Sequence, residues 1–140
     1  MSPDAAAHTV RLAQSGRVDR LGFLTLWRPH LEEIYAAGGD LPPTEHNHLE
    51  FLKVYDSYVA GSLWGLCTLG WVGAAEGPPH GCLLFGEEPG GWAFDTERPG
   101  RAGFLWGVHV EPDRRRQGLA WAMQDWTRHA AEGWDSGIGT

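Results

Sequence analysis

The sequence predicts a single α/β (α+β) domain, and three observations support this prediction. The chain has 140 residues, which is the size of one domain. Apolar runs typical of strands alternate with amphipathic stretches typical of helices. At this length, and with 42% hydrophobic and 21% charged residues, a single core can be buried without disulfides or structural metals.

The charge balance and the cysteines restrict the possible partners and the compartment. With 11 basic and 18 acidic residues, the formal net charge is −7. Nucleic acids and anionic membranes are bound mainly through Lys and Arg, so we expect neither as a partner, and any anion site must be local. Cys67 and Cys82 lack the spacing of a disulfide framework or a metal site. With no signal peptide and no apolar run of about 20 residues, we expect a cytoplasmic protein.

Residues 8–61 are expected to hold one strand followed by helices. The alternation in His8–Gln14 predicts a strand. Ser15 is expected to cap a helix whose buried face carries Val18, Leu21, Leu24 and Trp27. Because proline costs about 3 kcal/mol inside a helix, we expect a break at Pro29 and a second short helix through Ala37.

Thr44 is then expected to cap a third helix over residues 45–58. The apolar side predicted for this helix consists of Leu49, Leu52, Tyr55 and Val59. Together with Glu45, Glu50 and His30, its residues His46 and His48 would suggest a metal site, and a metal-dependent enzyme is a third alternative. His46 and His48 lie two positions apart and therefore point about 200° apart, so they do not form a chelating pair, and we expect no metal site.

Residues 62–110 are expected to form strands. Apolar or glycine-punctuated segments predict strands at 62–72, 81–85, 91–94 and 102–110. The last of these is almost continuously apolar, as in a central strand that is covered on both faces. The alternation of a strand places Trp106 with Val108, on the face opposite His109.

Residues 111–133 are expected to form a basic loop and an amphipathic helix. The helix is indicated by the spacing of Leu119, Met123, Trp126 and Ala130, and Gly133 ends it. The first amides of a helix have no partner within it, and the helix dipole adds positive charge there, so this position suits a phosphate. At Gly118 a side chain would hold the anion away.

The segment Val110-x-Pro112-x-x-Arg115-x-x-Gly118-x-Ala120 resembles the coenzyme A signature of the GNAT superfamily of N-acetyltransferases, whose core is Gln/Arg-x-x-Gly-x-Gly/Ala. The resemblance extends over about residues 8–133. It implies a GNAT-like, mostly antiparallel mixed sheet flanked by helices, in one acetyltransferase-like domain spanning residues 1–140. The family continues with a further strand, helix and final strands, so we expect a C-terminally shortened form of the fold.

The same resemblance implies a site for acetyl-CoA. The loop amides would bind the pyrophosphate, and the strand before the loop would pair with the pantetheine arm. The implied binding residues are Val108, His109, Val110, Arg115, Arg116, Gln117, Gly118, Leu119 and Ala120. His109 lies where members of the family place a base, and histidine titrates in a suitable range. The alternative is a histidine that only packs beneath the covering helices.

We therefore expect an enzyme that transfers an acetyl group from acetyl-CoA to a primary amine by direct attack. The acidic cluster Glu32, Glu33, Asp40, Glu45, Glu50 and Asp56 would favour a cationic acceptor, or it is simply a solvated helical surface. The alternative function is a non-catalytic module that binds CoA or another protein, completed by a partner chain. Because the signature strand would then have an open edge, we expect a homodimer or a complex.

Overall fold

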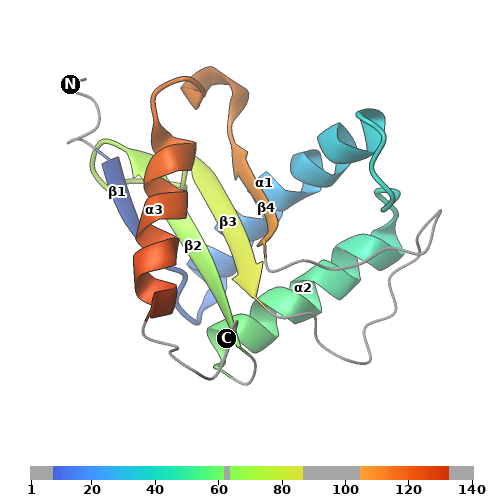
Figure 1. Cartoon of the computed structure of the whole chain (residues 1–140). Helices are drawn as coiled ribbons and strands as arrows, with labels where there is room; N and C mark the ends of the chain where they lie inside the picture. Colours follow the sequence, from blue (N-terminus) through green and yellow to red (C-terminus); the bar gives the residue numbers. More distant parts are fainter. Residues whose placement is uncertain (1–7, 62–63, 87–104, 133–140) are drawn as a thin grey trace.

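The computed structural model describes residues 8–61, 64–86 and 105–132. In this part of the chain, four strands form one antiparallel sheet in the order β1-β2-β3-β4. The strands are β1 (His8–Leu12), β2 (Gly65–Val72), β3 (Gly81–Gly86) and β4 (Leu105–Val110). Helices α1 (Arg17–Ala36) and α2 (Glu45–Val59) cover one face, and α3 (Leu119–Ala131) covers the other (Figure 1). This arrangement confirms the predicted α/β class, and the strand predicted at 91–94 lies outside the described residues.

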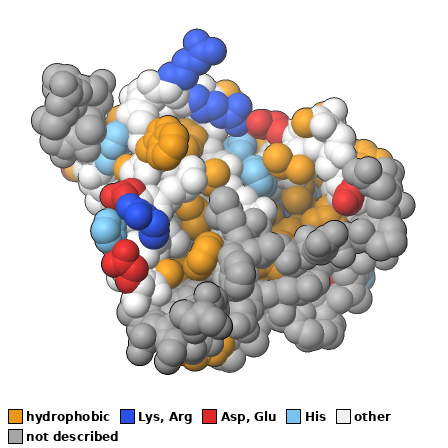
Figure 2. Space-filling view, in the orientation of Figure 1, with side chains coloured by type: hydrophobic (Ala, Val, Ile, Leu, Met, Phe, Trp, Pro, Cys, Tyr) orange, Lys and Arg blue, Asp and Glu red, His pale blue; other side chains and the backbone are white. Residues whose placement is uncertain are grey.

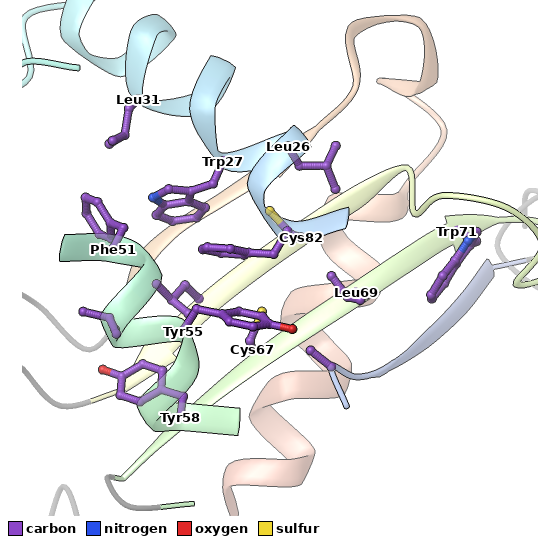
Figure 3. Close-up of a cluster of buried hydrophobic side chains, with 14 residues drawn as sticks. Leu26, Trp27, Leu31, Phe51, Tyr55, Tyr58, Cys67, Leu69, Trp71 and Cys82 are labelled. Carbon is purple, nitrogen blue, oxygen red and sulfur yellow. The ribbon is translucent and has the colours of Figure 1, made fainter. Parts of the chain in front are cut away.

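The two faces of the sheet are packed differently. On the α1–α2 face, aromatic rings of the two helices pack over the buried residues of β2 (Figure 3). The ring centroids of Phe23 and Tyr55 are 4.6 Å apart. On the α3 face, a smaller cluster contains Leu83, Val110, Leu119 and Met123. Complete burial of such a side chain stabilises the fold by about 1.5 to 3 kcal/mol, so both clusters hold the helices firmly on the sheet.

Helix α1 is continuous, and the predicted break at Pro29 is wrong. The helix runs from Arg17 to Ala36 with Pro29 inside it. Large side chains before and after the proline are buried, with Trp27 2% and Leu31 3% exposed. Their burial offsets the roughly 3 kcal/mol that proline costs in a helix.

The cap and the buried face of α1 also differ from the prediction. Gly16, not Ser15, precedes the first helical residue. Trp27 is buried as predicted, but Val18 and Leu21 are 81% and 65% exposed. The helix buries a different face, which also includes Asp19, Phe23, Leu26, His30 and Leu31. Asp19 fixes this rotation because its carboxylate accepts hydrogen bonds from Arg11 and from the Gln14 N–H.

Helix α2 begins where the sequence predicts, and its buried face agrees with the prediction in part. Thr44 Oγ1 accepts the Asn47 N–H at 3.1 Å, which confirms the predicted cap. Of the four predicted apolar side chains, Tyr55 is buried and Leu52 and Val59 pack against the core, whereas Leu49 is 50% exposed. The other buried apolar side chains are Phe51, Val54 and Tyr58. This face is favoured because its aromatic side chains complete the cluster that α1 begins.

Strand β4 is an edge of the described sheet and not a central strand. It pairs with β3 only, although α1 and α3 contact its two faces. Leu84 pairs with Gly107 and Phe85 with Leu105, so Trp106 is an extra residue in the ladder. Such a bulge interrupts the strict alternation of faces.

The bulge places Trp106 differently from the prediction. Trp106 packs on the α1–α2 cluster, where its Nε1 donates to Tyr58 Oη at 3.0 Å. Val108 packs on the α3 cluster. The prediction that Trp106 and Val108 share a face is therefore wrong.

Candidate functional site

The loop between β4 and α3 has an unusual backbone. A short 3-10 helix, η2 (Pro112–Arg114), leads into it. Arg116 has φ +66°, the one positive φ among the non-glycine residues that the structure describes. Gly118, immediately before α3, is also left-handed with φ +85°. Left-handed backbone of this kind turns successive amides toward one side, which is how proteins build concave anion sites.

The amides at the start of α3 have no acceptor in the described part of the chain. The first bond of the helix is from the Ala122 N–H to the Gly118 oxygen, and no side chain caps the helix. The N–H groups of residues 116–121 donate to no other described residue. Together with the helix dipole, they give this end of α3 a positive potential and several unused donors.

These amides lie beside a cavity of about 400 Å³ between β4, α1 and the start of α3. The cavity is lined by every residue predicted to bind acetyl-CoA except Gln117. Figure 2 shows basic side chains gathered over this end of the molecule, next to histidine and acidic side chains. The tertiary structure therefore brings the predicted strand edge and loop together around one hollow.

Gln117 and Gly118 contact His8 on β1. His8 Nε2 lies 2.6 Å from the Gln117 oxygen, so the imidazole donates a hydrogen bond from β1 to the loop. A Cβ added at Gly118 would lie only 3.1 Å from the His8 ring. Gly118 is thus required both by its φ and by its close contact with His8.

Arg115 connects the loop to α1. Its Nε donates to the Val110 oxygen at 2.7 Å, and its Nη2 donates to both carboxylate oxygens of Glu33, at 3.0 and 2.8 Å. This ion pair is the main cause of the lowered pKa of Glu33. The geometry makes Arg115 a clamp that holds the loop against α1, although it also lines the cavity.

His109 lies on the α1 side of β4, and only 4% of it is exposed. Its ring contacts that of His30, with centroids 5.4 Å apart. Burial lowers the pKa of His109, and Glu33 partly opposes that effect. Burial also lowers the pKa of His30 to about 4. Both rings line the cavity, so His109 packs beneath a helix and at the same time faces the site.

The sequence reasoning missed His30 as part of this site and treated Glu33 only as part of the acidic cluster. Both come from α1 and lie on the cavity wall more than 70 positions before the signature loop. The one local signal is their spacing, because residues three apart share a helix face. Trp121 was also missed; it is 78% exposed at the rim of the cavity.

Most members of the predicted acidic cluster form ion pairs with Arg or Lys side chains. Ion pairs join Glu33 to Arg115, Glu45 to Arg28, Glu50 to Lys53 and Asp56 to Arg20. Among the cluster members, only Glu33 lines the cavity. The attraction of this cluster for a cationic acceptor stays a prediction, and these pairings reduce the charge on which it depends.

A larger hollow of about 730 Å³ lies between β1 and α3, but it is lined by none of the residues predicted to bind acetyl-CoA. In the described ranges, no group of three or more His, Cys, Asp or Glu side chains is arranged to hold a metal ion. None of the helices in these ranges has the length and apolar character that a bilayer crossing requires.

The fold is similar to that of a protein from Desulfovibrio desulfuricans that has been assigned to the GNAT family of acetyltransferases. The two structures superpose with a TM-score of 0.55 at 15% sequence identity. The match covers 90% of this chain and 66% of the other protein, so this chain spans about two thirds of that protein's length. The chain therefore has an acetyltransferase-type fold. By sequence, neither a protein-family model nor a curated protein matches it.

Proposed function

We propose that this chain is an N-acetyltransferase that uses acetyl-CoA to acetylate a primary amine. The observation that carries the proposal is the row of amides at residues 116–121, which have no acceptor among the described residues and of which all but Gln117 belong to residues lining the cavity beside β4. A diphosphate is the group of CoA that such amides would hold, since charge-assisted hydrogen bonds contribute about 1.5 to 3 kcal/mol each. The acetyltransferase-type fold supports the same assignment.

The residues around the cavity fit such a ligand. Gly118 leaves the amides accessible, and the Glu33–Arg115 pair holds the loop in position. Residues Val108 to Val110 lie on the edge of β4 that has no strand partner in the described sheet, so their outward backbone groups are available to an extended ligand arm. When bound, acetyl-CoA would supply an activated thioester carbonyl.

This chain would mainly position the amine next to the thioester and supply a proton acceptor. An amine held next to the thioester attacks it directly, and ordering the two reactants supplies most of the acceleration. The new C–N bond forms as the C–S bond breaks, and the sulfur leaves as a thiolate that takes a proton from solvent. His109 lines the cavity and is the candidate to accept the proton of the attacking amine.

The test is a calorimetric titration of the purified chain with acetyl-CoA, followed by a thiol-release assay with a panel of primary amines. Saturable binding with amine-dependent release of CoA is the expected result. A folded chain that does not bind acetyl-CoA would contradict the proposal.

A second candidate is a CoA-binding or protein-interaction module that is completed by a partner chain. The unpaired edge of β4 in the described sheet favours it, because such an edge is a template for a strand of another chain. This candidate predicts binding without turnover, and a dimer or complex in sedimentation. A monomer that turns over amines would contradict it.

A further inference from the structure

Two buried histidine side chains contact each other on the cavity wall. His30 belongs to α1 and His109 to β4, and they are 7% and 4% exposed. Their ring centroids are 5.4 Å apart at an interplanar angle of 69°. Neither ring has a hydrogen-bond partner among the described residues. Both rings line the cavity, so their nitrogens can take a hydrogen bond from a molecule bound there.

The backbone of β4 is shaped to accommodate this pair. Gly107 and His109 are two positions apart and both face α1. A Cβ at Gly107 would overlap His30 Nε2 and lie 3.3 Å from the Trp27 ring. The bulge at Trp106 places Gly107 on this face, so bulge and glycine together make room for the His30 ring.

The charged groups nearest the pair are Glu33 on α1 and Arg115 on the loop, and these neutralise each other. Burial lowers the pKa of both histidines, to about 4 for His30, so both are neutral at pH 7. A neutral imidazole has one N–H and one nitrogen that accepts a hydrogen bond. In the tautomers that turn the unprotonated nitrogen toward the cavity, the pair offers two acceptors; the wall of this cavity also carries Arg114 and Arg116.

We propose that His30 and His109 together bind the nucleophilic nitrogen of the acceptor, and that His109 takes its proton. This inference rests on the proposed function and names a second residue, His30, that touches the substrate. The ammonium donates one N–H to each ring. The N–H bond to His109 then breaks, the nitrogen keeps the electron pair for attack on the thioester, and His109 becomes an imidazolium.

The geometry favours a nitrogen over a hydroxyl in this position. Two hydrogen bonds of about 2.9 Å can bridge acceptor atoms up to about 5.8 Å apart, which fits rings in contact. A primary ammonium has three N–H donors and can satisfy both imidazoles at once. A hydroxyl can donate to only one of the two rings and must accept an N–H from the other, and it lacks the charge that makes the hydrogen bonds of an ammonium stronger.

The first test measures binding without turnover. Protein with ¹⁵N-labelled histidines is titrated at pH 7 with propylamine and, separately, with 1-propanol. Propylamine is expected to shift the ring resonances of both His30 and His109 with one saturation curve, and 1-propanol is not. His30→Leu should weaken the effect on His109 at least about 10-fold, the loss of one hydrogen bond to a charged group. His48→Leu removes a buried histidine that does not line the cavity, so it should leave the effect intact.

A titration in which propylamine shifts only one ring or neither, or in which both variants behave alike, would overturn the inference. The thiol-release assay is independent of this result, so failure of the inference and failure of the proposed function can be told apart. Loss of acetyl-CoA binding would refute the function, whereas intact binding with no response of the two rings would refute only the inference.

The second test uses the amine that gives the fastest release of CoA. His30→Leu is expected to lower kcat/KM for this amine about 10- to 100-fold while the Kd for acetyl-CoA is unchanged. His30→Gln keeps a hydrogen-bond acceptor and should recover part of the loss. A merely structural His30 would give equal losses in both variants, together with weaker acetyl-CoA binding, and that outcome would also overturn the inference.

Discussion

Helices α2 and α3 begin in opposite ways. At the start of α2, Thr44 Oγ1 accepts the Asn47 N–H, and the acidic Glu45 stands in the first turn. At the start of α3, Gly118 has no side chain to serve as a cap, and the first turn holds no acidic residue. The amides of α2 are thus partly satisfied by the protein, whereas those of α3 open on a cavity.

The difference separates a helix start that stabilises the fold from one that is suited to a ligand. A side-chain cap stabilises a helix by about 1 kcal/mol, and α3 does without it. Its left-handed Arg116 adds strain to the same segment. Uncapped donors and strain that coincide beside a cavity are typical of a binding site. Changes at the two starts should therefore have separable effects, on stability for α2 and on binding for α3.

The largest effect is expected from Gly118→Leu. A Cβ there would crowd the His8 ring at 3.1 Å, and the side chain would obstruct the amides. Acetyl-CoA affinity should fall by more than about 100-fold, equivalent to losing at least one or two charge-assisted hydrogen bonds. Calorimetry measures this change.

Gly73→Leu is the matched control for Gly118→Leu. Gly73 also has a positive φ, of +90°, but nothing lies within 4 Å of a Cβ added there. Gly73→Leu should lower the free energy of unfolding by a similar amount, about 1 to 2 kcal/mol, and leave the affinity for acetyl-CoA unchanged. Equal losses of affinity in the two variants would mean that the start of α3 is not the binding site.

The next largest effect is expected from Asp19→Asn in α1. Like α3, helix α1 has no side-chain cap at its N-terminus. There the buried Asp19 accepts from Arg11 and from the Gln14 N–H. Asp19→Asn should lower the free energy of unfolding by about 2 kcal/mol at pH 7, because a charge-assisted pair is lost. Urea unfolding at pH 7 measures the change, and affinity for acetyl-CoA should not alter.

The Asp19 pair also predicts how stability depends on pH. Its hydrogen bond with Arg11 is the main cause of a folded-state pKa below 3.8. The stabilisation is therefore fully present above about pH 4, the unfolded pKa, and disappears as the pH falls through the folded value. Asp19→Asn should flatten this acid limb of the stability curve. An unchanged acid limb would show that other carboxylates determine it.

A smaller effect is expected from Thr44→Ala, which removes the cap of α2. The variant should lose about 1 kcal/mol of unfolding free energy, the usual cost of a lost cap. Acetyl-CoA affinity should remain that of the wild type, measured in the same titration as for Gly118→Leu. Weaker binding by this variant would contradict the division between the two helix starts.

The smallest effect is expected from Glu33→Gln, which loosens the clamp between α1 and the loop. Arg115 would keep its bond to the Val110 oxygen but lose the bidentate pair with Glu33. Because both partners are 40% or more exposed, solvent screens the pair, and affinity for acetyl-CoA should fall only about 3-fold. Glu32→Gln is a neighbouring control on the same helix. A loss of affinity as large as that of Gly118→Leu would show that Arg115 does more than position the loop.

The sequence predicted the elements better than it predicted their faces. The strand–loop–helix that contains Gly118 and the Thr44 cap could be read locally, because caps, glycines and periodicity act within a few residues. The buried faces of α1 and α2 agree with the prediction only in part, because several apolar stripes were possible on each helix. The choice among them was made by Asp19 and by stacking of rings such as Phe23 and Tyr55.

What the sequence determined by itself is a segment able to hold an anion: an apolar strand, a basic loop, and a glycine just before a helix. What only the tertiary structure decided is the rest of the cavity. His30 and Glu33 reach it from α1, which stays continuous through Pro29, and the bulge at Trp106 makes Gly107 face them. The reason is physical: local backbone preferences act along the chain, whereas the partners of a cavity are chosen by packing between segments that lie far apart in the sequence.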